Sequence, residues 1–280
     1  MLSERLLEKF DFSRAEVAEF YDELPLWSAP FGLLMLERVP IRNGLRILDV
    51  GAGTGFLSIE LAQRCGSESL VYAVDPWKHG IDRLRRKIDY LKLENVHIIE
   101  ADAAKLDLPD SSIDVVVSNL GVNNFENADA VLAQCYRVMV AGGQIFLTSN
   151  LVGHMREFYD VYRETLIELG ITDRLAALDE HINHRATVDS MRNRLERGGF
   201  DVTEVTEKSF TMRFADGTSL LNHYFIRLGF IEEWVKIAPI TSAEKTFQVL
   251  ERNLNSYAAS QGDLLLNIPM ALIEARKRNV

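Results

Sequence analysis

The sequence predicts an α/β fold in which a parallel β-sheet is covered by helices on both faces. Two observations support this prediction. Between residues 44 and 150, short apolar runs typical of buried strands alternate with amphipathic segments typical of helices, which is the pattern of successive βαβ units. Near its start, the apolar run 46–50 leads directly into a glycine-rich turn and then a helix, one half of a nucleotide-binding unit. Ligands of such sheets bind beyond the carboxyl ends of the strands.

The alternating region contains five predicted strands with helices between them. We expect strands at residues 46–50, 70–74, 96–100, 113–118 and 144–149. A helix from Phe56 follows the glycine turn, and a second helix at 78–93 carries an apolar stripe at helical spacing. We expect a third helix at 127–140, ended by the glycine pair at 142 and 143.

The segments on either side do not show this regular alternation of strands and helices. Residues 1–40 look helical and irregular, with a capping box at Ser13–Glu16. Beyond residue 150 we expect helices at 155–169 and 187–197, strand character at 200–214, a helix from Asp216, a helix from a capping box at Thr241–Glu244 to residue 258, and strand character at 265–275.

Composition narrows the classes of function. The chain has 280 residues, 47% of them hydrophobic, which suffices for one large or two small domains. A net charge of −10 and a pI near 5.2 disfavour nucleic-acid binding, and the basic cluster at 83–87 is expected to be a solvated helix face. Cys65 and Cys135 suggest neither a disulfide framework nor a metal pattern, which fits a reducing cytoplasm. No apolar run reaches the ~18–20 residues of a membrane span.

The spacing of the glycines indicates which ligand the first turn suits. Glycines stand at 51, 53 and 55, and Phe56 occupies the position where a dinucleotide fingerprint has its third glycine. A nicotinamide-dependent oxidoreductase is therefore disfavoured. The string Asp49-Val-Gly-Ala-Gly-Thr-Gly55 instead resembles motif I of the class I S-adenosylmethionine-dependent methyltransferases, and the chain looks most like their UbiE, or type 11, group.

This resemblance implies a Rossmann-like sheet of seven strands, mostly parallel, with helices on both faces. The family ends in a hairpin whose last strand enters the sheet antiparallel, and residues 200–207 and 265–276 match that hairpin. The expected domains are an N-terminal helical lid at 1–40, a methyltransferase domain at 41–209 with 263–280, and a helical cap insertion at 210–262.

The resemblance also implies that the chain binds S-adenosylmethionine. Asp49 would lie near the methionine amino group, with Gly51 and Gly53 against the methionine half of the cofactor. Asp75 follows the second strand, where a carboxylate can accept both ribose hydroxyls. Asp102 follows the third strand and would accept the adenine amino group, while a backbone N–H beside it meets a ring nitrogen.

Aromatic residues are further candidates for this site. Trp77 could stack on adenine or simply pack, and Tyr21 and Trp27 could contact the sulfonium or staple the N-terminal segment to the sheet. The full set of expected cofactor contacts is Asp49, Gly51, Ala52, Gly53, Asp75, Pro76, Trp77, Asp102, Ala103, Asn119, Leu120, Tyr21 and Trp27.

Candidates for the acceptor side are fewer. The loop at 118–125 lacks the Asn/Asp-Pro-Pro-Tyr/Phe string of methyltransferases that act on amides or nucleobase amines, and Asn123 could bind substrate or form a turn. On the predicted cap helix, Arg227 could bind a carboxylate and His223 could take a proton, with Tyr224 beside them.

Two further histidines have a spacing that could suit a metal. His181 and His184 lie three residues apart, but no acid or cysteine cluster accompanies them. We therefore expect no metal site and place both on a solvated helix face.

The predicted function is S-adenosylmethionine-dependent methyl transfer to a small-molecule acceptor by in-line displacement. The alternative is a module that binds the cofactor without turnover, which motif I does not exclude. Arsenite methylation needs several thiolates, which two cysteines on separate helices do not provide. The expected partner is a small molecule, with no nucleic acid and no membrane span, and a homodimer is a candidate assembly.

Overall fold

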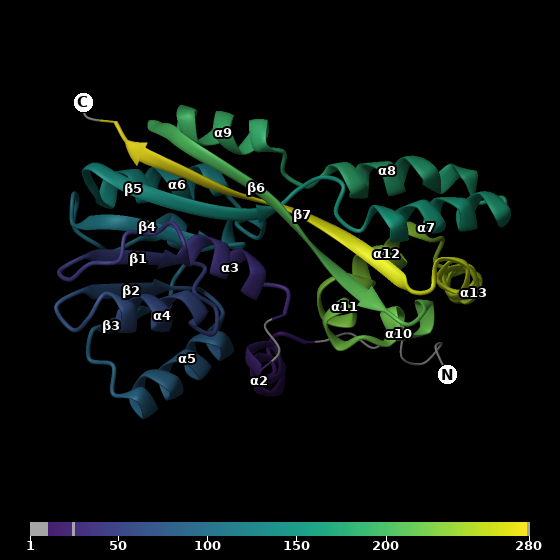
Figure 1. Ribbon diagram of the computed structural model, residues 1–280, viewed down its shortest axis with the longest axis horizontal. Coiled ribbons are helices and arrows are strands. Elements are labelled where there is room, and N and C mark those ends of the chain that lie inside the picture. The colour runs from purple at the N-terminus through teal and green to yellow at the C-terminus, as the bar shows by residue number, and fades with distance from the viewer. Residues whose placement is uncertain (1–10, 24–25, 279–280) are drawn as a thin grey trace. The chain divides into compact units, whose positions relative to one another are not determined.

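The protein is described by a computed structural model that covers residues 11–23 and 26–278 (Figure 1); the first ten residues of the predicted lid lie outside this description. Its contacts divide the chain into two compact units. The described residues of 12–150, 186–208 and 270–278 form the first, here called the sheet unit. Those of 151–185 and 209–269 belong to the second, here called the helical unit. Strands β6 and β7 contribute residues to both.

One seven-stranded sheet organises the sheet unit, in the order β3-β2-β1-β4-β5-β7-β6. The first five strands are parallel and β7 pairs antiparallel with β5, as predicted. The strand order reverses between β1 and β4, so the ligand crevice of such a fold is expected at the carboxyl ends of these two strands. The strands are β1 Arg46–Val50, β2 Leu70–Val74, β3 Val96–Ile99, β4 Ile113–Asn119, β5 Met139–Asn150, β6 Phe200–Phe214 and β7 Leu264–Lys277.

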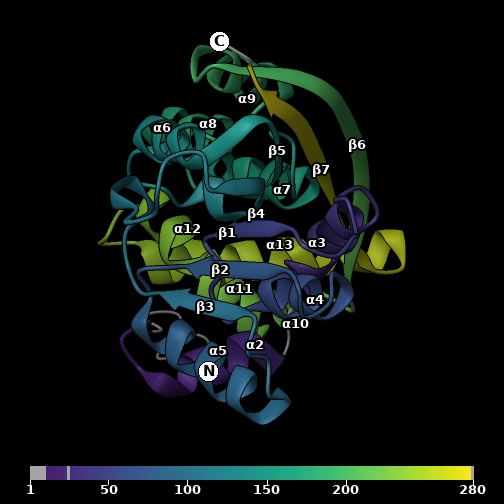
Figure 2. The same cartoon turned by 90° about the vertical axis from the view of Figure 1, so that its left-hand side faces the viewer.

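Helices lie on both faces of this sheet. Figure 2 shows α3 and α4 on one side and α6 on the other. In α4, Leu57 and Leu61 lie one turn apart and are both buried, which gives the helix one apolar face against the sheet. The helices of this unit are α2 Ala15–Glu23, α3 Ala29–Leu36, α4 Phe56–Arg64, α5 Lys78–Leu91, α6 Ala128–Val138 and α9 Val188–Arg197, with short 3-10 turns η1 Ala103–Lys105 and η2 Gly121–Asn123.

The glycine pair at 142 and 143 does not end a helix, contrary to the prediction. Helix α6 ends at Val138, and β5 begins at the next residue. The β4–β5 register shifts near the start of both strands, Gly142 has a φ of +71°, and a Cβ on Gly143 would lie 3.2 Å from the Asp114 carbonyl oxygen. The pair therefore serves an irregular start of β5, where a residue with a side chain would be strained.

The basic cluster of α5 is also not a purely solvated face. Asp22 of α2 accepts hydrogen bonds from Arg83, at 2.8 Å, and from Lys87, and Arg86 donates to Glu19 at 3.0 Å. The prediction failed because the acidic partners lie some sixty residues earlier, on a helix that folds back against α5. These ion pairs hold α2 against α5 within the sheet unit.

The helical unit is built on buried aromatic side chains. Tyr162 donates its hydroxyl to the Trp234 carbonyl at 2.9 Å, and the Phe158 and Trp234 rings stack with centroids 3.8 Å apart. Its elements, besides the ends of β6 and β7, are α7 Arg156–Glu168, η3 Thr172–Arg174, α8 Leu175–Asn183, α10 Gly217–Asn222, α11 Tyr224–Gly229, α12 Ile231–Ile237 and α13 Ala243–Gln261.

The helix predicted from Asp216 is interrupted. His223 has the extended angles φ −65° and ψ 130° between α10 and α11, and Phe230 separates α11 from α12. The capping box predicted at 241–244 does not form either, because α13 begins after Ser242 without a side-chain cap bond. Among the described residues, no helix is long and apolar enough to cross a membrane.

Candidate functional site

The turn between β1 and α4 requires its glycines. Gly51, Gly53 and Gly55 have φ angles of +78°, +54° and +91°, a region that L side chains rarely adopt. A Cβ on Gly51 would also lie 3.1 Å from the Cα of Gly121, in the loop after β4. A Cβ on Gly53 would meet nothing within 4 Å. The turn is therefore closely packed at Gly51, whereas open space lies next to Gly53. A ligand can approach the backbone at Gly53.

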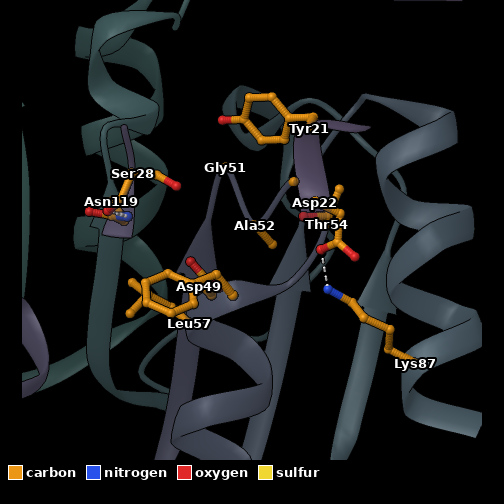
Figure 3. Close-up of a pocket in the computed structure, with 12 residues that line it drawn as sticks. Tyr21, Asp22, Ser28, Asp49, Gly51, Ala52, Thr54, Leu57, Lys87 and Asn119 are labelled. Carbon is orange, nitrogen blue, oxygen red and sulfur yellow. Dashed lines mark hydrogen bonds and ion pairs between the residues drawn. The ribbon is translucent and has the colours of Figure 1, made fainter. Parts of the chain in front are cut away.

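A cavity of about 290 Å³ lies at this turn, at the carboxyl ends of β1 and β4. Figure 3 shows Asp22 and Lys87 on one side of the turn and Ser28 with Asn119 on the other. Its lining residues are Tyr21, Asp22, Ser28, Asp49, Gly51, Ala52, Gly53, Thr54, Phe56, Leu57, Lys87 and Asn119.

Asp49 gives this cavity a buried carboxyl group. Its side chain is 1% exposed and accepts a hydrogen bond from the Ser58 hydroxyl at 2.6 Å. Burial raises the pKa of Asp49 to about 7, the charge of Asp75 adds to the rise, and the Ser58 bond opposes it. A cationic group of a ligand would favour the ionised form, so the site suits an ammonium or a sulfonium.

Asp75 organises the turn from the neighbouring strand. Its two carboxylate oxygens accept the backbone N–H of Gly53 and of Trp77, each at 2.8 Å. Burial raises the pKa of Asp75 despite these bonds. Each oxygen retains acceptor capacity for a ligand hydroxyl. The sequence singled out this residue for a ligand, but it did not foresee that Asp75 also holds the glycine turn.

Aromatic rings stand next to this carboxylate. The Trp77 ring makes edge contacts with Tyr21 and Phe12, at centroid distances of 5.6 and 5.5 Å, and its indole N–H donates to the Phe12 carbonyl. Burial and the Asp75 charge both raise the pKa of Tyr21. Trp27 is buried against Phe31 and is not among the residues that line the cavity.

The other predicted cofactor residues take different places. Asp102 is exposed and caps η1 by accepting the Ala104 N–H at 2.9 Å, while Ala103 is buried. Leu120 has a left-handed φ of +64°. Pro76 lies between Asp75 and Trp77 in sequence, outside the cavity lining.

Asn119 ties two chain segments together at the cavity. Its amide nitrogen donates to the Ser28 carbonyl at 3.0 Å, and its amide oxygen accepts from the Thr148 hydroxyl at 2.8 Å. The sequence identified Asn119 from its position after β4, but the bond to Ser28 was not predictable, since it joins residues 91 apart.

Sequence reasoning missed six residues that also line the cavity: Asp22, Ser28, Thr54, Phe56, Leu57 and Lys87. The Lys87 and Arg83 hydrogen bonds overcome the effect of burial and hold the pKa of Asp22 below its ordinary value. The sequence did show an acid, Asp22, next to Tyr21 and a basic run at 83–87. Hydrophobic periodicity does not indicate that these distant residues pair with each other.

The acceptor candidates fall in both units. In the sheet unit, Asn123 donates to the Asn150 side-chain oxygen at 2.9 Å and accepts from the Ser149 hydroxyl at 2.5 Å. In the helical unit, the Nδ1 of His223 is buried and has no partner among the described residues. Tyr224 and Arg227 lie in α11, so His223 and Arg227 are not on one continuous helix as predicted.

Of the two histidines predicted on a solvated face, His184 is exposed, but the prediction for His181 was wrong. His181 is half-buried, and its Nε2 lies 3.1 Å from the Tyr159 hydroxyl, so it does not lie on a solvated face. Helix α8 packs on α7, which carries Tyr159. No group of three or more potential metal-ligating side chains occurs in the part of the chain that the structure describes.

Comparisons with known proteins agree with this geometry. The family described as "Methyltransferase domain" matches residues 47–143. The ubiquinone/menaquinone biosynthesis C-methyltransferase UbiE of Shewanella pealeana is 30% identical over 184 residues, which are 61% of this chain and 72% of that protein.

Two solved structures share the fold. The YcgJ protein of Bacillus subtilis has a TM-score of 0.61 at 14% identity, over 90% of this chain and 100% of that one. A phosphoethanolamine N-methyltransferase of Haemonchus contortus, solved with S-adenosylhomocysteine, has a TM-score of 0.54 at 19% identity, over 90% of this chain and 53% of that one.

The chain belongs to the class I S-adenosylmethionine-dependent methyltransferases, in the family of the UbiE C-methyltransferases. The predicted family, fold and cofactor are thereby confirmed, and the protein is an enzyme that transfers a methyl group from S-adenosylmethionine.

Proposed function

We propose that this enzyme methylates a small aromatic acceptor and holds its cofactor in the cavity of Figure 3. The observation that carries the acceptor class is the similarity to UbiE over 72% of its length, because that relative is named for ubiquinone and menaquinone biosynthesis. The absence of an Asn/Asp-Pro-Pro-Tyr/Phe string after β4 supports an acceptor other than an amide or a nucleobase amine.

The residues that line the cavity fit S-adenosylmethionine, together with Asp75 and Trp77, which lie outside the lining but are connected to it through the Asp75–Gly53 hydrogen bond. Asp49 would bind the methionine ammonium, because its buried carboxylate accepts hydrogen bonds from Ser58 but has no cationic partner among the described residues. Gly53 would leave room for the methionine half. Asp75 would accept ribose hydroxyls, and Tyr21 and Trp77 would present aromatic surface to the sulfonium or the adenine.

The bound cofactor supplies an electrophilic methyl group, and the chain supplies alignment. Fixing an acceptor in line with that group can lower the activation free energy of methyl transfer by about 7–11 kcal/mol at best. Asn123 is the proposed positioning residue on the sheet unit, since its amide is fixed by Ser149 and Asn150. Arsenite methylation finds no support, because Cys65 and Cys135 are both buried. A cytoplasmic location and a homodimer remain predictions from the sequence.

The test combines cofactor binding with acceptor screening. Calorimetry with S-adenosylhomocysteine should show binding to the unmodified protein and roughly tenfold to hundredfold weaker binding to Asp75→Asn, because hydrogen bonds to a charged group contribute about 1.5–3 kcal/mol. The exposed Asp107→Asn is the matched control. Methyl-labelled cofactor should then label phenols or hydroxyquinones but not peptides or DNA. Labelling of only the macromolecules would refute the acceptor class.

A further inference from the structure

The helical unit contains a polar cluster that the cofactor chemistry does not use. His154 lies just before α7, Tyr159 within α7, His181 within α8, and Arg185 just after α8. The His154 side chain is 1% exposed. Its ring lies 5.8 Å from the Tyr159 ring and 6.2 Å from the Phe230 ring, between centroids. A buried polar ring thus has two aromatic rings beside it.

Several buried atoms of this cluster lack a hydrogen-bond partner among the described residues. They are both ring nitrogens of His154 and the Nε of Arg185. Buried polar groups in folded proteins are nearly always hydrogen-bonded, so each unpaired atom calls for an explanation. His154 is the strongest of these signals, because neither ring nitrogen makes a well-formed hydrogen bond and its one polar interaction is a weak one with the Leu151 backbone.

The polar neighbours are already engaged with one another. The Trp234 indole N–H donates to the Tyr159 hydroxyl at 3.2 Å, and the same hydroxyl is hydrogen-bonded to His181 Nε2 at 3.1 Å. His184 Nδ1 contacts the His181 carbonyl. None of these groups therefore serves His154 or Arg185 in this arrangement.

The cluster places one cation, Arg185, beside neutral imidazole rings without a matching anion. Burial, the Arg185 charge and the two nearby histidines lower the pKa of His154 to about 3, against the opposing effect of the Leu151 backbone, and burial lowers the pKa of Arg185. The charge of Glu233 raises the pKa of Arg185. The ion pair of Glu233, however, is with Lys236, at an N–O distance of 2.5 Å. The missing partner is negatively charged and accepts hydrogen bonds.

We propose that this cluster binds a small aromatic acid, whose oxyanion accepts hydrogen bonds from Arg185 Nε and a His154 ring N–H. Arg is well suited to carboxylates, and the rings of Phe230, Tyr159 and Trp234 favour a flat apolar body over an inorganic anion. Arg185 is only partly buried, which gives the acidic group access from solvent. This site goes beyond the proposed function, because its ligand need not be the methyl acceptor.

Titration of the full protein with benzoate, salicylate and the neutral benzyl alcohol tests the proposal. Calorimetry should show saturable binding of both acids and none of the alcohol. Arg185→Gln should lower the affinity for benzoate at least tenfold. His154→Phe, which preserves ring packing, should do the same. The control Arg163→Gln removes an equal charge from the Arg163–Asp179 pair on the same unit and should leave benzoate affinity unchanged.

Two further measurements separate binding from folding and from methyl transfer. The melting temperature of Arg185→Gln should equal or exceed that of the unmodified protein, since the variant removes a partly buried charge whose Nε has no hydrogen-bond partner among the described residues. Its affinity for S-adenosylhomocysteine should be unchanged, so this result does not depend on the proposed acceptor. The proposal is overturned if neither acid binds, if benzyl alcohol binds as tightly, or if Arg185→Gln binds benzoate normally.

Discussion

Replacing Asp49 by asparagine should stabilise the cofactor-free enzyme while weakening its cofactor binding. The pKa of Asp49 rises from 3.8 to about 7 on folding. Between these values the folded state binds the extra proton, so stability falls as pH rises from about 4 to 7 and stays reduced above that. At roughly 1.4 kcal/mol per pKa unit, the ionised carboxylate costs on the order of 4 kcal/mol at pH 8.

The amide introduced by Asp49→Asn would keep the Ser58 hydrogen bond through its oxygen, but its N–H group would need a new partner, which costs about 1–2 kcal/mol. We therefore expect Asp49→Asn to gain about 2–3 kcal/mol in the free energy of unfolding at pH 8. The gain should shrink as pH falls toward 4. Affinity for S-adenosylhomocysteine should fall at least tenfold, because the ammonium loses its counter-charge.

Urea unfolding at pH 5, 6, 7 and 8 measures this difference. Asp114 provides a control of opposite sign, because its hydrogen bond with Arg46 holds the pKa of Asp114 below its ordinary value. Asp114→Asn should destabilise the protein by a similar amount at every pH from 5 to 8, and the loss should shrink only in an added measurement below about pH 4, where Asp114 itself becomes protonated. If Asp49→Asn is less stable than the unmodified enzyme at pH 8, or if its gain does not vary with pH, the reasoning is wrong.

Three other substitutions test the site. Gly51→Ala should destabilise the fold more than Gly44→Ala, because both have a left-handed φ but only Gly51 would place a Cβ 3.1 Å from a backbone atom; equal melting temperatures would contradict this. Asp22→Asn should speed amide hydrogen exchange in α2 and weaken the binding of S-adenosylhomocysteine. Glu19→Gln, which loses only the exposed ion pair with Arg86, should do neither. Asn123→Ala should lower kcat without changing S-adenosylhomocysteine affinity, and a change confined to cofactor affinity would refute its positioning role.

The sequence predicted the parts of the fold that local chemistry specifies. The glycine turn and the five parallel strands follow from residues close together in the chain, as does the position of Asp75 at the end of a buried strand. The glycine pair at 142 and 143 misled the prediction, because a strand irregularity and a helix stop both use glycine. Only the register between β4 and β5 distinguishes them.

The remaining errors concern partners that are distant in sequence. The basic residues of α5 pair with acids of α2, and His181 pairs with a tyrosine of the preceding helix. His154 was not singled out at all, because a lone histidine carries no pattern. Its significance depends on burial and on unpaired nitrogens, which only three-dimensional coordinates reveal.

Strands β6 and β7 have a practical consequence for dissecting this enzyme. The fragment 12–150 contains the whole cofactor cavity but omits β7, which hydrogen-bonds along β5 from Gln144 to Asn150. Such a fragment would expose a row of unsatisfied backbone donors and acceptors on a long, largely apolar strand, and exposed edges of this kind promote self-association. A minimal cofactor-binding fragment would therefore need residues 186–208 and 270–278, supplied by a linker or as a separate peptide.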